Sequence, residues 1–374
     1  MNVPSIELPL LPLERVSPSR FGALKKCRLR EVWIASKIQT PLPSAPAAKL
    51  GTVIHSVLEH VARGRVDSIE GLEGIWETTI ALVEKKMMES ESEKHLVPLA
   101  SSVYYFEVKK RMCMKIASEL LQPVREYREG SACPPSAGKT ERWLESNDKV
   151  IGGAIDRIET STDGDILIDY KSGAILQDDE AGEESRIKED YQLQMKLYAG
   201  LYHETFGRLP VLAKLVALDG TIYEVAFTEQ ECMDLMEQAK KLLAEINGII
   251  NSNADITSKL NKLASPSPEN CKYCLFRPGC IPYLRIRSES ALHVEWPLDF
   301  SGNICEMIRL GNGRLLVKVL KDTGEKLVIR GLHPGRHKTL ANKVAKIMFF
   351  SVRPEATPGC YIEGLQTMVF PVTV

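Results

Sequence analysis

The sequence predicts an α/β fold, with a sheet flanked by helices, followed by a small all-β region. Three observations lead to this expectation. Amphipathic helical patterns fill most of residues 51–128. Two hairpin patterns then alternate with helical ones between residues 149 and 252, and short strand patterns dominate after about residue 290. A chain of 374 residues is long enough for two or three hydrophobic cores.

The composition is ordinary for a soluble globular protein, with 44% hydrophobic and 26% charged residues. No apolar run approaches the roughly 20 residues that span a bilayer, and no basic leader precedes an apolar run at the N-terminus. We therefore expect a cytoplasmic protein without membrane contact. Nine cysteines do not suggest a disulfide scaffold in a chain of this size. Residues 281–374 carry 13 Lys and Arg against 8 Asp and Glu, a mild indication of a polyanionic partner.

The first half of the chain is predicted to be helical. A short helix is expected over "PSRFGALKKCRLREVW", followed by a Pro-rich linker at residues 40–48. Further helices are expected from Gly51 to near Gly64, over 68–90 and over 100–128. We divide the chain into an N-terminal segment, a central domain and a small C-terminal domain, at residues 1–50, 51–288 and 289–374.

The pattern then changes period. Two strands, "KVIGGAIDRIE" and "DILIDYKSG", are joined by a turn at Asp163-Gly164. A helix follows over "EDYQLQMKLYAGLYHETFG", and a second hairpin turns at Asp219-Gly220. A long helix is expected after Thr228 as its N-cap, and a Pro-rich loop at residues 264–280.

The strand "ILIDYK" carries the residues of greatest chemical interest. Residues two apart on a strand share a face, so Asp169 and Lys171 point the same way, and the partner strand can bring Asp156 close. Two converging carboxylates repel each other unless a cation lies between them, and oxygen ligands favour magnesium or manganese. With a lysine to neutralise a phosphoryl group, this set suits metal-assisted phosphodiester hydrolysis. The alternative is a surface hairpin with solvated charges.

Two helical pairs accompany this hairpin. His55 and Glu59 are four residues apart and share a helix face, so a histidine nitrogen is available to a metal. Gln194 and Tyr198 are also four apart on the helix after the hairpin. Alone, His55 is better explained as a helix-surface residue, and Gln194 and Tyr198 are unremarkable. In combination, G-x-x-x-H-x-x-x-E, G-G-x-x-D-R-I, D-Y-K-S-G and Q-x-x-x-Y occur in this order, which resembles the RecB-like branch of the PD-(D/E)xK nucleases over roughly residues 15–285.

The resemblance implies a restriction-endonuclease-like mixed central sheet flanked by helices. It also implies metal ligation by four groups and a catalytic role for a lysine, with two further residues supporting the site: ligands His55, Asp156, Asp169 and the Tyr170 carbonyl, the lysine Lys171, and the supporting Gln194 and Tyr198. Glu141 is a weaker match to an acid found ahead of the first strand. The motif departs from the commoner form at Glu159, where Asp is more usual.

Three cysteines lie close together in the Pro-rich loop, as Cys271-x2-Cys274-x5-Cys280. This spacing is compatible with a metal or cluster site that lacks one ligand. With Cys27, the set resembles the iron–sulfur subgroup of the same family, which includes AddB-type proteins and CRISPR-associated adaptation nucleases. That resemblance implies a [4Fe–4S] cluster; the alternative is a zinc ion on the same ligands. The other cysteines are expected to be ordinary thiols: Cys113, Cys133, Cys232, Cys305 and Cys360.

The C-terminal pattern of about five short strands, with a helix between the third and fourth, resembles an OB-type barrel. Such barrels bind single strands through a basic groove and stacking aromatic rings. Candidate contacts are Arg330, Arg336, Lys338, Phe349 and Phe350. The alternatives are a structural lid or a protein-docking module, with the two phenylalanines in its core.

These expectations describe a Mg2+- or Mn2+-dependent deoxyribonuclease, an exonuclease on single-stranded DNA ends, in DNA repair, recombination or phage defence. No G-x-x-x-x-G-K-[ST] phosphate loop occurs, so no ATP motor is expected within these residues. The alternative is a nuclease-fold DNA-binding subunit of a helicase–nuclease or CRISPR adaptation complex, with a helicase or other protein as partner.

Overall fold

The computed structural model describes residues 6, 8–128, 139–177, 185–289, 295–342 and 346–372. Its centre is a five-stranded sheet with the strand order β1-β2-β3-β6-β7. Strands β3 and β6 run parallel, whereas the other neighbours are antiparallel. The expected mixed sheet is therefore confirmed. The strands are β1 (Lys139–Glu145), β2 (Gly152–Ser161), β3 (Gly164–Lys171), β6 (Leu212–Ala217) and β7 (Ile222–Glu224).

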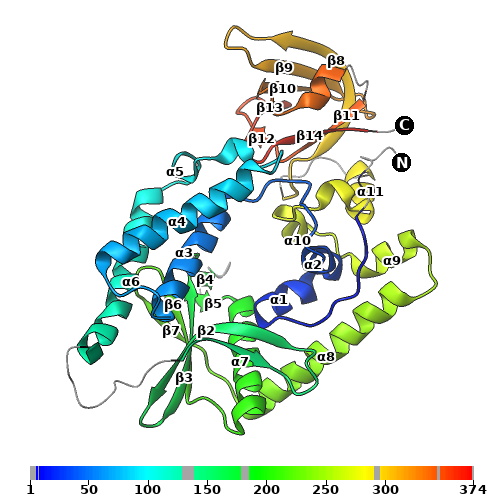
Figure 1. Cartoon of the computed structure of the whole chain (residues 1–374). Coiled ribbons are helices and arrows are strands. Elements are labelled where there is room, and N and C mark those ends of the chain that lie inside the picture. The colour runs from blue at the N-terminus through cyan, green and yellow to red at the C-terminus, as the bar shows by residue number, and fades with distance from the viewer. Residues whose placement is uncertain are drawn as a thin grey trace.

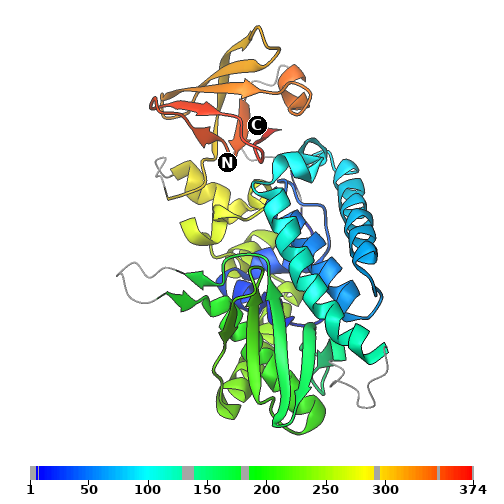
Figure 2. The same ribbon diagram turned by 90° about the vertical axis from the view of Figure 1, so that its left-hand side faces the viewer.

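Helices cover both faces of this sheet, and alternation along β3 decides which side chain meets which layer. Leu167 packs with helices α1 (Pro18–Lys26), α7 (Glu189–Phe206) and α8 (Glu229–Asn251) on one face. Ile168 and Tyr170 pack with α3 (Pro46–Ala62), α4 (Ile69–Met88) and α6 (Phe106–Arg128) on the other. Figures 1 and 2 show these two helical layers with the sheet between them.

Several helix ends follow from local sequence chemistry. Thr228 caps α8 in a capping box, in which its hydroxyl accepts from the Glu231 backbone N–H and the Glu231 carboxylate accepts from the Thr228 N–H. Helix α7 ends at Gly207, whose φ of 69° lies in the left-handed region that favours glycine. Helix α3 begins at Pro46, inside the stretch expected to be linker, because proline suits the first helical turn.

The N-terminal helix differs from expectation. The stretch expected to form one helix is two, α1 and α2 (Arg28–Ala35), separated at Cys27. Cys27 has an extended backbone, with φ of −151° and ψ of 101°. The break matters because it places a candidate metal-ligating cysteine at a corner between two helices rather than on a helix face.

The remaining elements are short. They are η1 (Lys94–Leu96), α5 (Leu99–Ser102), β4 (Leu176–Gln177), β5 (Arg186–Ile187), α9 (Ile256–Leu263), α10 (Pro268–Lys272), η2 (Arg277–Gly279) and α11 (Ile281–Glu289). The Pro-rich loop thus contains α10 and η2. No helix of the described ranges is long and apolar enough to cross a membrane.

The C-terminal region, residues 295–372, forms a second sheet in the order β12-β13-β10-β9-β8-β11-β14. Seven strands are present in its described residues rather than about five, because two very short ones follow β11. The expected helical turn, η3 (Lys338–Asn342), does lie between the third and fourth strands of this region. The strands are β8 (Phe300–Arg309), β9 (Leu315–Leu320), β10 (Lys326–Leu332), β11 (Lys346–Phe350), β12 (Arg353–Pro354), β13 (Cys360–Ile362) and β14 (Met368–Pro371).

This region rests on the cysteine-bearing segment. In Figures 1 and 2 it lies at the end of the molecule beyond α10 and α11, away from the five-stranded sheet. Met348 and Phe350 of β11 share a buried cluster with Cys271 and with Tyr283 of α11. Phe349 and Phe350 are fully buried, so they serve as core residues and are not exposed stacking platforms.

Candidate active site

The site lies where β3 ends beside the first half of the antiparallel strand β2, between helices α3 and α7. The register that pairs Arg157 with Ile168 brings Asp156 alongside the end of β3, where its Oδ2 accepts a hydrogen bond from the Tyr170 backbone N–H at 2.8 Å. Lys171 Nζ lies 2.6 Å from Asp169 Oδ2. The hairpin thus assembles the two carboxylates and the lysine that the sequence singled out.

Gln194 on α7 connects two of these groups. Its amide Nε2 donates to Asp169 Oδ1 at 2.7 Å, and its Oε1 accepts from Lys171 Nζ at 2.9 Å. Because Gln194 and Asp169 are both buried, this amide fixes the relative position of acid and lysine. We therefore describe Gln194 as a positioning residue.

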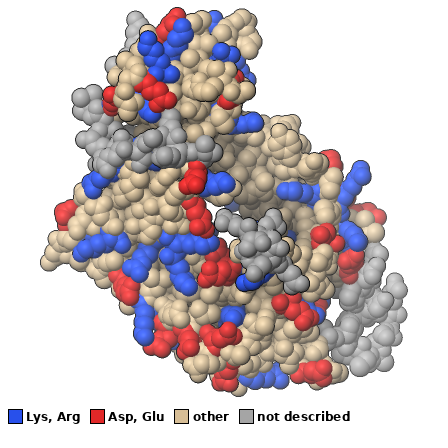
Figure 3. All heavy atoms as spheres, turned by 180° about the vertical axis from the view of Figure 1, so that it is seen from behind, with Lys and Arg blue, Asp and Glu red and all other residues tan. Residues whose placement is uncertain are grey.

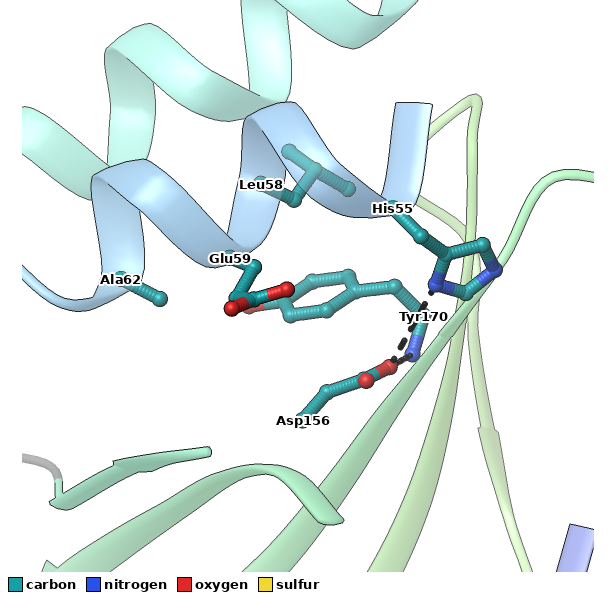
Figure 4. A pocket seen from close by; sticks show the side chains of 6 residues that line it. All are labelled: His55, Leu58, Glu59, Ala62, Asp156 and Tyr170. Atoms are coloured by element: carbon teal, nitrogen blue, oxygen red, sulfur yellow. Dashed lines mark hydrogen bonds and ion pairs between the residues drawn. The ribbon is translucent and has the colours of Figure 1, made fainter. Parts of the chain in front are cut away.

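Helix α3 supplies the opposite wall. His55, Leu58, Glu59 and Ala62 line a pocket of about 70 Å³ together with Asp156 and Tyr170. In Figure 4 the side chains of His55 and Glu59 point toward Asp156, and His55 Nδ1 lies 3.9 Å from Asp156 Oδ2. The structure thus brings together the histidine, the acids and the lysine from three separate segments of the chain.

Crowded acids shape the electrostatics of the pocket. Burial, and next the charge of Asp169, raise the pKa of Asp156 to about 7, against the partial opposing effect of its backbone hydrogen bond. Burial lowers the pKa of His55, which favours the neutral imidazole that binds metals. The two acids therefore disfavour being ionised together, and a cation beside them would relieve that repulsion.

Glycines of the motifs allow this close packing. A Cβ at Gly51 on α3 would come within 2.9 Å of Ser172 Oγ, directly after the β3 lysine. A Cβ at Gly153 on β2 would come within 2.9 Å of Pro18 Cδ and 3.1 Å of the Tyr198 hydroxyl. Gly153 therefore allows α1 and α7 to approach the backbone of β2 closely, whereas at Gly51 only the Ser172 hydroxyl would have to move.

Tyr198 anchors helix α7 to the sheet. Its hydroxyl donates to the Ala154 carbonyl at 2.6 Å, and its ring is buried. Burial raises its pKa further above its ordinary value, so it stays a phenol. Tyr198 therefore supports the site by holding α7 against β2.

Tyr191 is a site residue that sequence reasoning missed. The Lys171 ammonium lies 4.6 Å from the centroid of its ring, and the Lys188 ammonium lies 5.8 Å from the same centroid. A tyrosine seven residues before Tyr198 on the same helix was the available signal, since residues seven apart share a helix face. The side chain of Glu141, the weaker candidate acid, lies outside the described residues.

A divalent cation fits this donor set. Asp169 Oδ2 lies 2.6 Å from Lys171 Nζ, and the neighbouring pocket is lined by the imidazole of His55 and the carboxylates of Glu59 and Asp156, which are donors that divalent cations accept. As the side chains stand, no three His, Cys, Asp or Glu side chains of the described residues converge closely enough to hold one ion. A bound ion would therefore need these side chains to move closer together.

The four candidate cluster cysteines line a second pocket. It is bounded by Cys27 at the α1–α2 corner and by Cys271, Cys274 and Cys280, with Arg30 and Arg277 beside them. Burial raises the pKa of Cys271 to about 12 and raises that of Cys274, so both are held as thiols in the absence of a metal. Thiol donors of this kind suit zinc or iron–sulfur chemistry. Cys133 lies outside the described residues.

The three candidate DNA contacts of the C-terminal region differ in exposure. Lys338 is 73% exposed and pairs with Glu91 at 3.3 Å, and Arg330 is 53% exposed. Arg336 is only 15% exposed, and its guanidinium binds Glu363 and the backbone carbonyls of residues 364, 365 and 367. On the face seen in Figure 3, basic and acidic side chains are interspersed over both parts of the molecule.

Comparison with known proteins agrees with this geometry. The sequence profile of the PD-(D/E)XK nuclease superfamily matches residues 15–281. The chain is 27% identical over 215 residues to an ATP-dependent helicase/nuclease subunit of Alkaliphilus metalliredigens, and 31% identical over 207 residues to the corresponding subunit of Alkaliphilus oremlandii. A third such protein, from Oceanobacillus iheyensis, is 30% identical over 165 residues.

These matches cover about half of this chain but little of the relatives. They span 53%, 51% and 43% of the chain, and 17%, 16% and 12% of the three relatives' own length. The similarity is thus confined to one part of much longer proteins.

Proposed function

Because the chain belongs to the PD-(D/E)XK nuclease superfamily, we propose that it is a magnesium- or manganese-dependent deoxyribonuclease with Asp156, Asp169 and Lys171 as catalytic residues. The observation that carries the proposal is the meeting of two acids and a lysine. Asp169 lies 2.6 Å from Lys171 Nζ, and burial together with the charge of Asp169 raises the pKa of Asp156 to about 7. Such a pair favours a bound cation.

Each residue has a defined task in this proposal. His55, Asp156, Asp169 and the Tyr170 carbonyl hold the ion. When bound, the ion supplies Lewis-acid activation of a water and of the phosphate. Lys171 neutralises charge that develops on the phosphoryl oxygens, and Gln194 keeps its ammonium beside Asp169.

We propose single-stranded DNA ends as the substrate. The relatives are named as helicase/nuclease subunits, and a helicase generates single strands. End-labelled linear DNA, circular single-stranded DNA, duplex DNA and a matched RNA should be incubated with the protein and Mn2+. Rapid loss of linear single strands with circles intact is expected. Cleavage of circles at the same rate would show that the protein is an endonuclease and not an exonuclease.

We further propose that Cys27, Cys271, Cys274 and Cys280 hold a [4Fe–4S] cluster. The shared pocket supports this, because four thiols from segments about 240 residues apart in sequence line it. Protein purified without oxygen is expected to be brown with about four irons per chain, and Cys274→Ser is expected to bleach it. A colourless protein with stoichiometric zinc would establish the zinc alternative.

A second candidate function is a DNA-positioning subunit of a helicase–nuclease or CRISPR adaptation complex. The names of the relatives favour it, since each belongs to an ATP-dependent helicase/nuclease. Both candidates are compatible with roles in DNA repair, recombination or phage defence. Cleavage by the purified chain alone separates them, because a positioning subunit binds DNA without cutting it.

A further inference from the structure

Arg277 occupies an unusual position in the second pocket. It lies between Cys274 and Cys280 in sequence, in the turn η2, and its side chain is only 3% exposed. Its Nη1 donates to the carbonyls of Cys274 at 2.8 Å and of Cys271 at 3.1 Å. The guanidinium thus braces the backbone that carries two candidate ligands.

The counter-ion of Arg277 comes from the C-terminal region. Asp299, directly before β8, accepts from Arg277 Nε at 2.7 Å, and its side chain is fully buried. Ser351 Oγ, just after β11, accepts from Arg277 Nη2 at 2.6 Å. The guanidinium therefore joins the cysteine loop to Asp299 and Ser351, which lie 22 and 74 positions further along the chain.

Asp299 is itself held on both sides of this junction. Its Oδ2 also accepts from the Tyr283 hydroxyl of α11 at 2.7 Å, and its Oδ1 accepts from the Ser351 backbone N–H at 2.8 Å. A buried ion pair is stable only while both partners and their hydrogen bonds are kept, because one unpaired buried charge is strongly destabilising. The C-terminal region and the cysteine loop therefore form a single buried network.

We propose that Arg277 and Asp299 belong to the metal site, as positioning residues through which the C-terminal region holds the cysteine loop ready for a thiolate-bound metal or cluster. The inference rests on the proposed cysteine site and extends it. Thiolates around a metal carry net negative charge, and Arg277 supplies a fixed positive charge and two backbone braces beside them. Loading of the cysteine site and docking of the C-terminal region are then thermodynamically coupled.

The test uses the full chain and one isosteric change, Asp299→Asn, which leaves Arg277 without its counter-ion. Glu363→Gln is the matched control. It breaks another buried ionic network of the same region, formed with Arg336 and His337, which contributes no residue to the cysteine pocket. If Asp299 had only a structural role, both variants would change metal retention and cysteine labelling in proportion to their loss of melting temperature.

The first measurement is the rate at which a chelator removes metal from protein purified without oxygen. Asp299→Asn is expected to weaken metal retention about 10- to 100-fold, as loss of outer-sphere partners commonly does. Glu363→Gln is expected to retain metal as the parent does. Equal retention in all three proteins would overturn the proposal.

The second measurement does not depend on a metal being present. Chelator-treated proteins are alkylated with iodoacetamide, and labelling of Cys271 and Cys274 is followed by mass spectrometry. Both cysteines are nearly buried in the parent, so faster labelling in Asp299→Asn alone is expected. Labelling at parent rates would overturn the coupling. Absence of both iron and zinc from the parent protein would contradict the proposed cluster. The labelling experiment would still test the role of Arg277.

If Asp299→Asn does not fold, Ser351→Ala replaces it. That change removes one hydrogen bond to Arg277 and keeps the Ser351 backbone bond to Asp299. A smaller increase in labelling of the same two cysteines is expected, and unchanged labelling counts against the proposal.

Discussion

Asp156 couples the charge of the pocket to the stability of the fold. Its pKa rises from 3.8 to about 7 on folding, so the folded state binds a proton that the unfolded state has released. Stability of the metal-free protein therefore falls as the pH rises from about 4 through about 7. We predict that Asp156→Asn raises the melting temperature in EDTA at pH 8 and changes it little at pH 5. Thermal melts at both pH values check this.

The same acid provides a metal test. A bound cation relieves the repulsion only when Asp156 is ionised, so Mg2+ is expected to raise the melting temperature of the parent more at pH 8 than at pH 5. In Asp156→Asn that difference is expected to shrink. Equal stabilisation of both proteins at both pH values would show that the ion binds elsewhere.

Tyr191 tests whether the ring beside Lys171 positions it. The ring face attracts the ammonium, and phenylalanine keeps that attraction whereas leucine does not. We predict that Tyr191→Leu lowers kcat by about 10-fold, the effect of roughly 1.4 kcal/mol in the barrier, and that Tyr191→Phe stays near the parent. An equal loss in both variants would assign the effect to the hydroxyl.

At the scale of elements, the approach of helices to the sheet depends on single glycines. We predict that Gly153→Ala lowers both stability and cleavage, because its methyl would press on Pro18 and on the Tyr198 hydroxyl that anchors α7. Gly74→Ala is the matched control. Gly74 lies in α4 with no atom within 4 Å of an added Cβ, so alanine there is expected to stabilise by roughly 0.5–1 kcal/mol.

Denaturant melts of both variants measure this contrast. If Gly153→Ala were as stable and active as Gly74→Ala, the close packing of α1, α7 and β2 would not constrain the site.

The elements also show how far the sequence carries. Periodicity and turn chemistry predicted β2, β3, α7 and α8, because alternation, Asp163-Gly164 and the Thr228 cap act within a few residues of chain. The break at Cys27 was not predictable in this way. It depends on a contact between Cys27 and the cysteine loop, which lies far away in the sequence. The Arg277–Asp299 pair is likewise a contact between segments, which no local pattern encodes. The spacing of Tyr191 from Tyr198 indicates a shared helix face, but it does not predict the contact of the Tyr191 ring with Lys171.

At the scale of the whole molecule, the C-terminal region remains a candidate DNA-binding surface through Arg330 and Lys338. Their ion pairs with Glu355 and Glu91 are solvent-exposed and contribute little, so both cations stay available to phosphates. We predict that the double variant Arg330→Gln, Lys338→Gln binds single-stranded DNA with a weaker salt dependence. The slope of log K against log[salt] is expected to become shallower by about 1.4, because each lost phosphate contact removes about 0.7.

Anisotropy titrations of a labelled oligonucleotide between low and moderate salt check this slope. An unchanged slope would contradict DNA binding by these two residues and favour a protein-docking role for the region. Arg336 is left out of the pair, because its removal would disturb the Glu363 network and confound binding with folding.

Truncation before the C-terminal region is not a clean alternative. A chain ending near Ser288 would expose the cluster shared by Tyr283 and Phe350 and would leave Arg277 without Asp299. The region is therefore part of the folded unit that contains the cysteines, and point changes test its roles better.

The central claim is that a cation held between Asp156 and Asp169 drives cleavage of DNA. The most direct measurement is the initial rate of cleavage of an end-labelled single strand as Mn2+ is titrated, for the parent and for Asp169→Asn with its fold verified by circular dichroism. The account predicts saturable, EDTA-sensitive cleavage by the parent and a rate at least about 10³-fold lower for the variant at every Mn2+ concentration. Cleavage by Asp169→Asn at the parent rate, or cleavage by the parent in EDTA, would contradict it.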